Sequence, residues 1–146
     1  MTKLNLPSYP FRIRTSGQSK EIFDLLRKKF VPLTPEEWVR QHFIRFVQDQ
    51  LQYPEGYITV EKGLTVNTRA KRTDIVIHNS EGNPWMIVEC KSPQIRLSEE
   101  TFYQSASYHL KLNVRFLVIT NGIQHYCCKF ADGNFHFIKG FPIYNE

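Results

Sequence analysis

Two short segments rich in Ile and Val, residues 74–78 and 85–90, stand on either side of a polar stretch, Asn-Ser-Glu-Gly-Asn-Pro. Such segments, joined by residues that favour turns, are typical of a β-hairpin. If the hairpin turns between Glu81 and Gly82, the numbers of any two facing residues add up to 163. This pairing is the strongest constraint that the sequence places on the fold.

The expected register brings three ionisable side chains together. Asp74 lies opposite Glu89, and Lys91 follows two residues later on the same face of the strand. Two facing carboxylates destabilise a sheet unless a cation compensates them, and Mg²⁺ suits oxygen ligands and phosphate. With Lys91 near the attacking water, this chemistry favours phosphodiester hydrolysis. The alternative is a surface cluster in which the two acids pair with Lys91 and Arg72, worth at most about 1 kcal/mol per pair.

The rest of the chain predicts an α/β domain with a mixed central β-sheet flanked by helices. Thr34, followed by Pro35 and Glu37, is a typical helix start, because the hydroxyl and the carboxylate can each bind a backbone N–H group. We expect an irregular arm at 1–18 and a single domain at 19–146. Apolar periodicity indicates helices at 20–30, 34–51 and 97–112. Further strands are expected at 57–66, 115–120, 125–130 and 135–138.

Composition limits the class of protein. The chain has 19 basic and 14 acidic side chains, a net charge of +5, which suits an anionic partner without identifying it. Since no apolar run approaches the roughly 18 residues of a membrane span and no secretory signal is evident, we expect a cytoplasmic protein without a membrane partner. The oligomeric state is left open. Cys127 and Cys128, with His125 and His136, lack the spacing of a zinc site, so packing is their expected role.

Several motifs resemble a known family. Thr73-Asp74 followed by Glu89-Cys90-Lys91 resembles the PD-(D/E)xK nuclease signature, although Thr73 stands where the signature has Pro. Gln104 and Tyr108 resemble the Q-x-x-x-Y motif that follows this signature in the nuclease domain of type I restriction-enzyme R subunits. Residues 34–41 (Thr-Pro-Glu-Glu-Trp-Val-Arg-Gln) and 120–122 (Thr-Asn-Gly) resemble the N-terminal region of the same subunits. The resemblance covers about residues 20–142.

The resemblance implies a restriction-endonuclease-like fold and a Mg²⁺-dependent DNA endonuclease, with Mn²⁺ as a substitute metal. It implies that Asp74, Glu89 and the backbone carbonyl of Cys90 bind the metal, and that Lys91 acts at the attacking water. Glu37 would add to the metal site through a water molecule. The other interpretation of Glu37 is that it only caps its helix.

The resemblance also implies roles on the DNA side. Gln104 and Tyr108 would support the site or contact the DNA backbone; otherwise they form a polar helix face. The basic residues that precede Asp74 could contact phosphates or could form a solvated basic loop. These residues are Arg69, Lys71 and Arg72.

One feature separates the chain from complete R subunits. Residues 16–20 (Ser-Gly-Gln-Ser-Lys) lack the glycine spacing of a phosphate-binding loop, so we expect no ATP-driven translocation by this chain. A separate helicase, or modification and specificity subunits, are the expected partners besides DNA. The alternative function is a catalytically silent nucleic-acid-binding or assembly module that acts with a separate motor protein.

Overall fold

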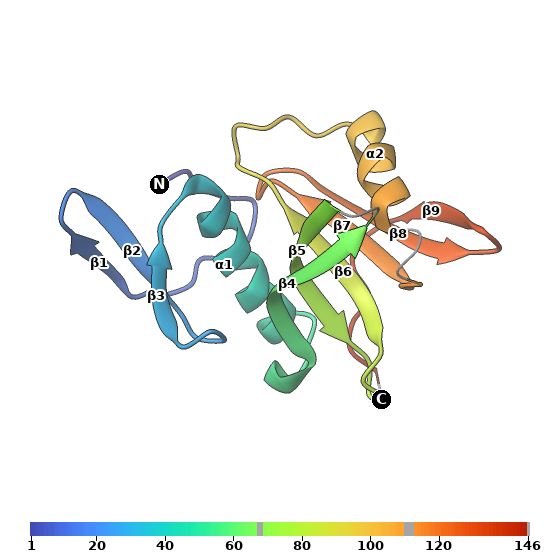
Figure 1. The fold of residues 1–146 in the computed structure, drawn as a ribbon, viewed down its shortest axis with the longest axis horizontal. Coiled ribbons are helices and arrows are strands. Elements are labelled where there is room, and N and C mark those ends of the chain that lie inside the picture. Colours follow the sequence, from blue (N-terminus) through green and yellow to red (C-terminus); the bar gives the residue numbers. More distant parts are fainter. Residues whose placement is uncertain (67–68, 110–112, 146) are drawn as a thin grey trace.

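The computed structural model describes residues 1–66, 69–109 and 113–145, without the side chains of 61–74 and 108–109. In this part of the chain, a small antiparallel sheet precedes a larger mixed sheet that packs with two helices (Figure 1). The small sheet contains β1 (Ile13–Ser16), β2 (Ser19–Asp24) and β3 (Lys29–Pro32). The large sheet contains β4 (Ile58–Val66), β5 (Arg69–His78), β6 (Pro84–Cys90), β7 (Phe116–Thr120), β8 (His125–Ala131) and β9 (Asn134–Ile138). The helices are α1 (Pro35–Asp49) and α2 (Glu99–His109), with a 3₁₀ turn η1 (Glu55–Tyr57). The mixed α/β class is therefore confirmed.

The large sheet follows the order of the chain, from β4 at one edge to β9 at the other. Every neighbouring pair is antiparallel except β6 and β7, which are parallel. Parallel neighbours need a crossover connection, and α2 lies in that connection. β6 is thus an interior strand, with β5 and β7 on its two sides.

The register predicted for the β5–β6 hairpin is confirmed where its pairs are described. Ile75 faces Val88, Val76 faces Ile87 and Ile77 faces Met86, and each pair has residue numbers that add up to 163. The register then shifts at a bulge between Ile77 and His78. Because side chains alternate along a strand, this register decides which residues of β6 face each helix.

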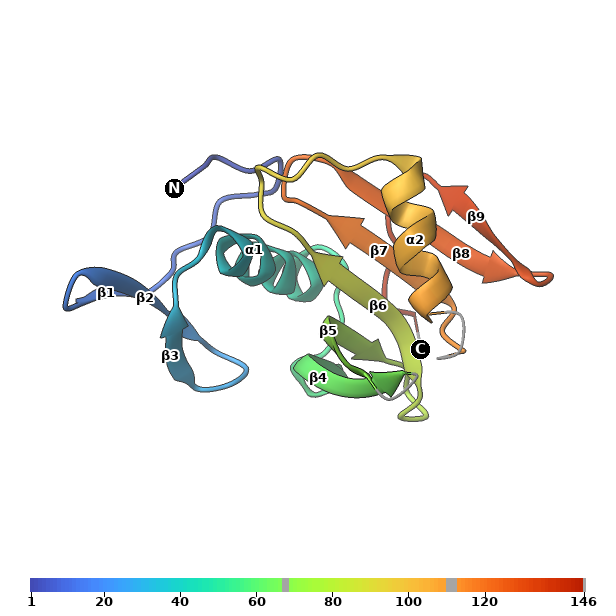
Figure 2. The ribbon, with the colours of Figure 1, turned by 45° about the horizontal axis from the view of Figure 1, so that its top comes forward.

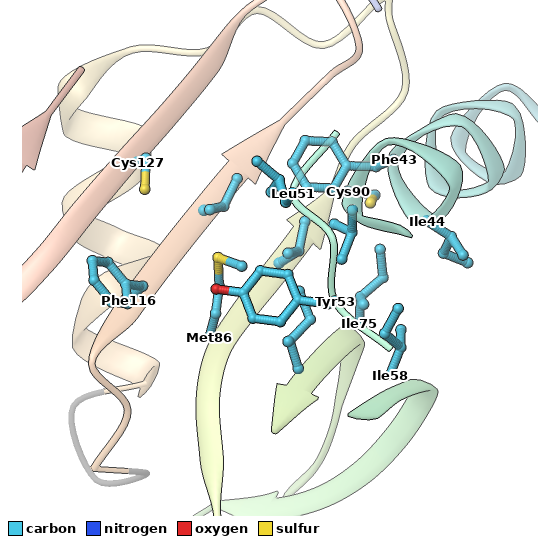
Figure 3. Close-up of a cluster of buried hydrophobic side chains, with 14 of the residues drawn as sticks. Phe43, Ile44, Leu51, Tyr53, Ile58, Ile75, Met86, Cys90, Phe116 and Cys127 are labelled. Carbon is cyan, nitrogen blue, oxygen red and sulfur yellow. The ribbon is translucent and has the colours of Figure 1, made fainter. Parts of the chain in front are cut away.

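The two helices cover opposite faces of the sheet (Figure 2). Phe43 and Ile44 of α1 pack with Ile75 and Cys90 on one face (Figure 3). On the other face, Phe102 and Ala106 of α2 belong to a second cluster with Val76, Ile87 and Leu117. Each strand near the centre therefore contributes alternate residues to two apolar cores.

The predicted helix at 20–30 is wrong. Ser19–Asp24 and Lys29–Pro32 are paired strands, in which Ile22 faces Val31 and Phe23 faces Phe30. The expected irregular arm also contains a strand, because Ile13 pairs with Ile22. Apolar residues in this region fit a helical spacing, but Asp24 accepts hydrogen bonds from the backbone N–H groups of residues 26 and 27 and thereby closes a turn.

Smaller differences concern the ends of elements. β4 begins at Ile58, because residues 55–57 form η1. α2 begins at Glu99 after a cap by Ser98, whose hydroxyl accepts a hydrogen bond from Thr101 N. Residues 110–112 of the predicted helix lie outside the described residues. The Thr34 part of the predicted α1 cap is confirmed, since Thr34 Oγ1 accepts a hydrogen bond from Glu37 N, but Thr34 N donates to Pro32 O rather than to the Glu37 carboxylate. Among the described helices, none is long and apolar enough to cross a membrane.

Candidate active site

Glu89 and Lys91 form an ion pair at the carboxyl end of β6. Lys91 Nζ lies 3.6 Å from Glu89 Oε2, and the two side chains are 38% and 12% exposed, respectively. Val88 and Cys90, the neighbours of Glu89 in the strand, pack on the α1 side of the sheet. Because side chains alternate along a strand, the Glu89 side chain projects from the opposite face. The carboxylate is thus mostly shielded from water, whereas the ammonium group reaches solvent.

Asp74 is the next residue of β5 beyond the last described pair of the hairpin. Ile75 pairs with Val88, and one further step along this register leads to Asp74 and Glu89. The side chain of Asp74 itself lies outside the described residues. The pairing of Asp74 with Glu89 stays a prediction, which follows from continuing the described register by one step.

The backbone beyond Glu89 is held by the neighbouring strand. Cys90 pairs with Thr120 of β7, and Lys91 N donates a hydrogen bond of 2.8 Å to Thr120 O. Asn121 then fixes the loop after β6, because its Nδ2 donates to Ile95 O at 2.8 Å. This buried asparagine also accepts hydrogen bonds from the N–H groups of Ile123 and Gln124. Residues 120–122 therefore have a structural role directly beside the ion pair.

Glu37 is bound by the small sheet and by its own helix. Glu37 Oε1 accepts a hydrogen bond of 2.6 Å from Arg40 Nη1. Glu37 Oε2 accepts hydrogen bonds from Arg27 Nη2 at 3.0 Å and from Gln41 Nε2 at 2.9 Å. Since α1 covers the face of the sheet opposite to the Glu89 side chain, these contacts explain the burial of Glu37 without reference to a metal.

Asp24 completes this buried polar network. Gln41 Nε2 donates to Asp24 Oδ2 at 3.0 Å, and Arg27 Nε lies 2.5 Å from the same oxygen. Burial alone would raise the pKa of Asp24, but hydrogen bonds from the backbone and side chain of Arg27 and from Gln41 outweigh it and lower the pKa below 3.8. The sequence did not predict that Asp24, Arg27 and Gln41 surround Glu37, because a helix was expected where Asp24 and Arg27 lie.

Sequence comparison identifies the family of this domain. Residues 35–142 match the model of the type I restriction enzyme R protein N terminus. The chain belongs to this family. None of the curated proteins matches the chain in sequence.

A solved relative supports the fold of this R-protein N-terminal domain. A fragment of a protein described as an HsdR subunit of a type I restriction enzyme from Vibrio vulnificus YJ016 is similar, with a TM-score of 0.55. Sequence identity is 17%, and the match covers 76% of this chain and 24% of the other. The chain thus spans about a quarter of that relative, and the likeness concerns the fold.

The remaining predicted site residues of the R-protein domain are distributed over two elements. Gln104 lies on α2 with an exposed side chain, whereas the side chain of Tyr108 lies outside the described residues. The basic residues before Asp74 are not in a loop, as one interpretation had it, but in β5. Arg69 pairs with Val66 and Arg72 with Gly63 of β4, and Lys71 lies between them in the same strand. Their side chains are outside the described residues.

The adjacent cysteines pack in two different cores. Cys127 belongs to the cluster on the α1 side and Cys128 to the cluster on the α2 side. Burial raises the pKa of each thiol to about 12. The expectation that these residues serve packing is confirmed.

Proposed function

We propose that this domain is a restriction-endonuclease-like nuclease that hydrolyses DNA phosphodiester bonds with Mg²⁺. The observation that carries the proposal is the ion pair between Glu89 and Lys91 at the end of β6, one register step beyond the pair formed by Ile75 and Val88. Membership of the R-protein N-terminal family supports a role in restriction and modification. Asp74, Glu89 and Lys91 are the proposed catalytic residues.

The chemistry of the available donors fits a hard divalent cation. Asp74 and Glu89 supply carboxylates, and the carbonyl of Cys90 is a neutral oxygen donor of the kind that Mg²⁺ accepts. The 12% exposure of the Glu89 side chain favours a nearby positive charge, because an ionised carboxylate is costly to shield from water. We leave Glu37 out of the metal ligands, since both of its oxygens already accept hydrogen bonds from arginine or glutamine side chains.

The protein side of the mechanism follows from the ion pair. Mg²⁺, when bound, would supply Lewis-acid stabilisation of negative charge on the phosphoryl oxygens. The exposed ammonium group of Lys91 would orient the attacking water by a hydrogen bond and would offset the charge that develops on the phosphate. Glu89 would hold Lys91 in place through the 3.6 Å contact. Gln104 and Tyr108 would contact the DNA backbone from α2.

The partners in this proposal are DNA and the other components of a type I restriction system. A motor or helicase unit, together with modification and specificity subunits, would bring DNA to the domain. Arg69, Lys71 and Arg72 of β5 would bind DNA phosphates near Asp74.

Nicking of supercoiled plasmid DNA tests the catalytic proposal. The parent protein should nick DNA in Mg²⁺ or Mn²⁺ and should not do so in EDTA. Glu89→Gln and Asp74→Asn keep the side-chain shape but remove the charge, so they should lower the nicking rate by about 100-fold or more. Lys91→Ala should have a similar effect.

Glu81→Gln is the matched control, because Glu81 lies exposed in the turn of the same hairpin. The control should nick at the parental rate, and circular dichroism should show that all variants are folded. Equal nicking by Lys91→Ala and the parent would refute the mechanism. DNA binding that persists without nicking and is indifferent to both Mg²⁺ and Asp74→Asn would instead establish a silent binding module.

A further inference from the structure

The net positive charge of the chain lies in its first 34 residues. This segment contains seven basic and two acidic side chains, whereas residues 35–146 contain twelve of each. The segment includes all three strands of the small sheet and precedes the region that matches the R-protein family. Residues 1–34, which include the small sheet, therefore carry a net charge of +5 outside the candidate active site, a distribution that attracts an anionic partner.

Alternation along the strands separates an inner and an outer face of the small sheet. Ile22 and Val31 face one another and are buried. Phe23 and Phe30, the next pair, lie on the other face with their ring centroids 5.1 Å apart. The small sheet lies beside the start of α1 and projects away from the large sheet (Figures 1 and 2). Arg12 and Arg14, which lie next to these rings, are exposed.

Two arginines cover these rings. Arg14 Cζ lies 3.9 Å from the ring centroid of Phe30, and Arg12 Cζ lies 4.6 Å from that of Phe23. Both distances are within the range of cation–π interactions. We call Arg12, Arg14, Phe23 and Phe30 the arginine face. The guanidinium groups are held over the rings, so they would lose less conformational freedom on binding a ligand than free arginines would.

A hollow next to the arginine face adds a third guanidinium. Its volume is about 130 Å³, and it is bounded by Arg45 of α1 as well as by Arg12. Arg45 Cζ lies 5.9 Å from the ring centroids of both Tyr9 and Phe11. The complete lining is Pro10, Phe11, Arg12, Phe23, Leu25 and Arg45. Arg12 and Arg45 therefore both line the hollow, and Arg12 also belongs to the arginine face.

The arrangement fits phosphate better than it fits a protein partner. The groups that a partner would meet first are the exposed guanidinium groups of Arg12 and Arg14, which lie over the aromatic rings and suit an anion. Glu21 is the one acid that contacts the arginine face in the described structure, and it pairs with Arg14 at 2.9 Å. Arg14 is nevertheless 55% exposed, so this carboxylate leaves much of its surface accessible. The fork of a guanidinium group matches two phosphate oxygens.

We propose that the arginine face binds the phosphate backbone of DNA, independently of base sequence and of divalent metal. The choice of DNA rests on the proposed function, but the binding surface is separate from Glu89 and Lys91. The face would hold DNA on the domain while the phosphodiester chemistry takes place at the end of β6.

Fluorescence anisotropy with a labelled 20-base-pair duplex in EDTA tests this proposal on the full chain. The double variant Arg12→Ala/Arg14→Ala should bind about ten-fold more weakly in 0.1 M salt. The slope of log K against log salt should become shallower by about 1.8, since each lost phosphate contact contributes about 0.9. Arg12→Lys/Arg14→Lys keeps the charge and should restore most of the salt slope, with weaker affinity than the parent.

The matched control is Arg115→Ala/Lys139→Ala, which removes the same charge from exposed positions outside the small sheet. The control should bind DNA as the parent does. Equal weakening by the control, or parental DNA binding by Arg12→Ala/Arg14→Ala, would overturn the proposal. Arginine-dependent binding of poly-L-glutamate with unchanged DNA binding would also overturn it, in favour of an acidic protein partner. Arginine-dependent DNA binding without any nicking by the parent would uphold this inference while the proposed nuclease function fails.

Discussion

Arg27 Nη2 lies 3.0 Å from Glu37 Oε2, and this contact joins the turn between β2 and β3 to the first turn of α1. The exposed fractions of the two side chains are 15% and 6%, so the pair is largely shielded from water. Arg27 also pairs with Asp24, whose side chain is 1% exposed. Arg27 thus pairs with two buried acids, of which Glu37 also pairs with Arg40, and it helps to attach the small sheet to α1.

We predict that Arg27→Ala lowers the free energy of unfolding by about 3–5 kcal/mol, because it leaves two carboxylates buried without this cation. Urea denaturation followed by circular dichroism measures the change. Arg14→Ala is the control, since it removes an exposed ion pair and should cost at most about 1 kcal/mol. A cost below about 1 kcal/mol for Arg27→Ala would show that the network contributes little to stability.

Buried His42 and partly buried His125 predict a loss of stability in mild acid. Burial lowers the pKa of His42 and of His125 below 6.5. His125 Nε2 lies 3.1 Å from Asn5 O, and its Nδ1 lies 2.6 Å from Thr120 Oγ1. As the pH falls, each histidine is protonated in the unfolded chain before it is protonated in the folded protein. The contribution of these histidines to the free energy of unfolding is therefore fully present above about pH 6.5 and decreases as the pH drops toward their lowered pKa values in the folded state. Each histidine can contribute a slope of up to about 1.4 kcal/mol per pH unit.

Urea denaturation at pH 7.5, 6.5 and 5.5 measures this dependence, and His125→Gln should make the slope below pH 6.5 shallower. An unchanged slope would show that His125 does not drive the loss.

Asp24 predicts a second loss of stability at lower pH, because its pKa is lowered below 3.8 in the folded state. Stability from Asp24 is present above about pH 3.8 and is lost as the pH falls through the lowered value.

Gly122 is predicted to resist substitution because of a close approach of the N-terminal segment. Its φ is +87°, and a Cβ atom there would lie 2.7 Å from Leu4 Cδ2 and 3.1 Å from Val39 Cγ2. Gly133 also has a positive φ, +77°, but a Cβ at that position meets no atom within 4 Å. Gly133→Ala therefore measures the backbone strain alone, about 1 kcal/mol, whereas Gly122→Ala should cost a further 1–3 kcal/mol or so for the clash.

Thermal and urea denaturation of both alanine variants measure this difference. Leu4→Ala/Gly122→Ala should be less destabilised than the sum of the two single changes, because the truncated leucine makes room for the new methyl group. Equal costs at positions 122 and 133 would contradict the clash.

The sequence predicted the parts of the fold that depend on local signals. The hairpin register follows from the turn around Gly82 and from the alternation of β5 and β6, and the cap of α1 follows from Thr34. The small sheet was missed because Ile22 and Phe30 fit a helical spacing, whereas their real partners are set by pairing between strands. Likewise, no local pattern shows that Arg27 reaches Glu37, ten residues away.

The same distinction applies to the candidate site. The spacing of Glu89, near the end of β6, and Lys91, directly after the strand, is a local feature, and the two side chains are in contact. The metal-binding role of Asp74, Glu89 and Cys90 stays a prediction. The surroundings of Glu37 could not be predicted, since they depend on the position of the small sheet relative to α1.

Burial of the thiols predicts that the folded protein resists alkylation and disulfide exchange. Cys90, Cys127 and Cys128 are buried, and the pKa of each of the last two is raised to about 12. Because thiolate is the reactive form, Ellman's reagent at pH 8 should react with all three thiols promptly in 6 M guanidinium chloride and only at the rate of unfolding in the native protein. Ser80→Cys places a thiol in the exposed hairpin turn and should react at once, with one equivalent per chain. Gly122→Ala should accelerate the slow reaction, because a less stable fold opens more often. Native cysteines that react as fast as the thiol of the Ser80→Cys variant would show that the two cores do not exclude solvent.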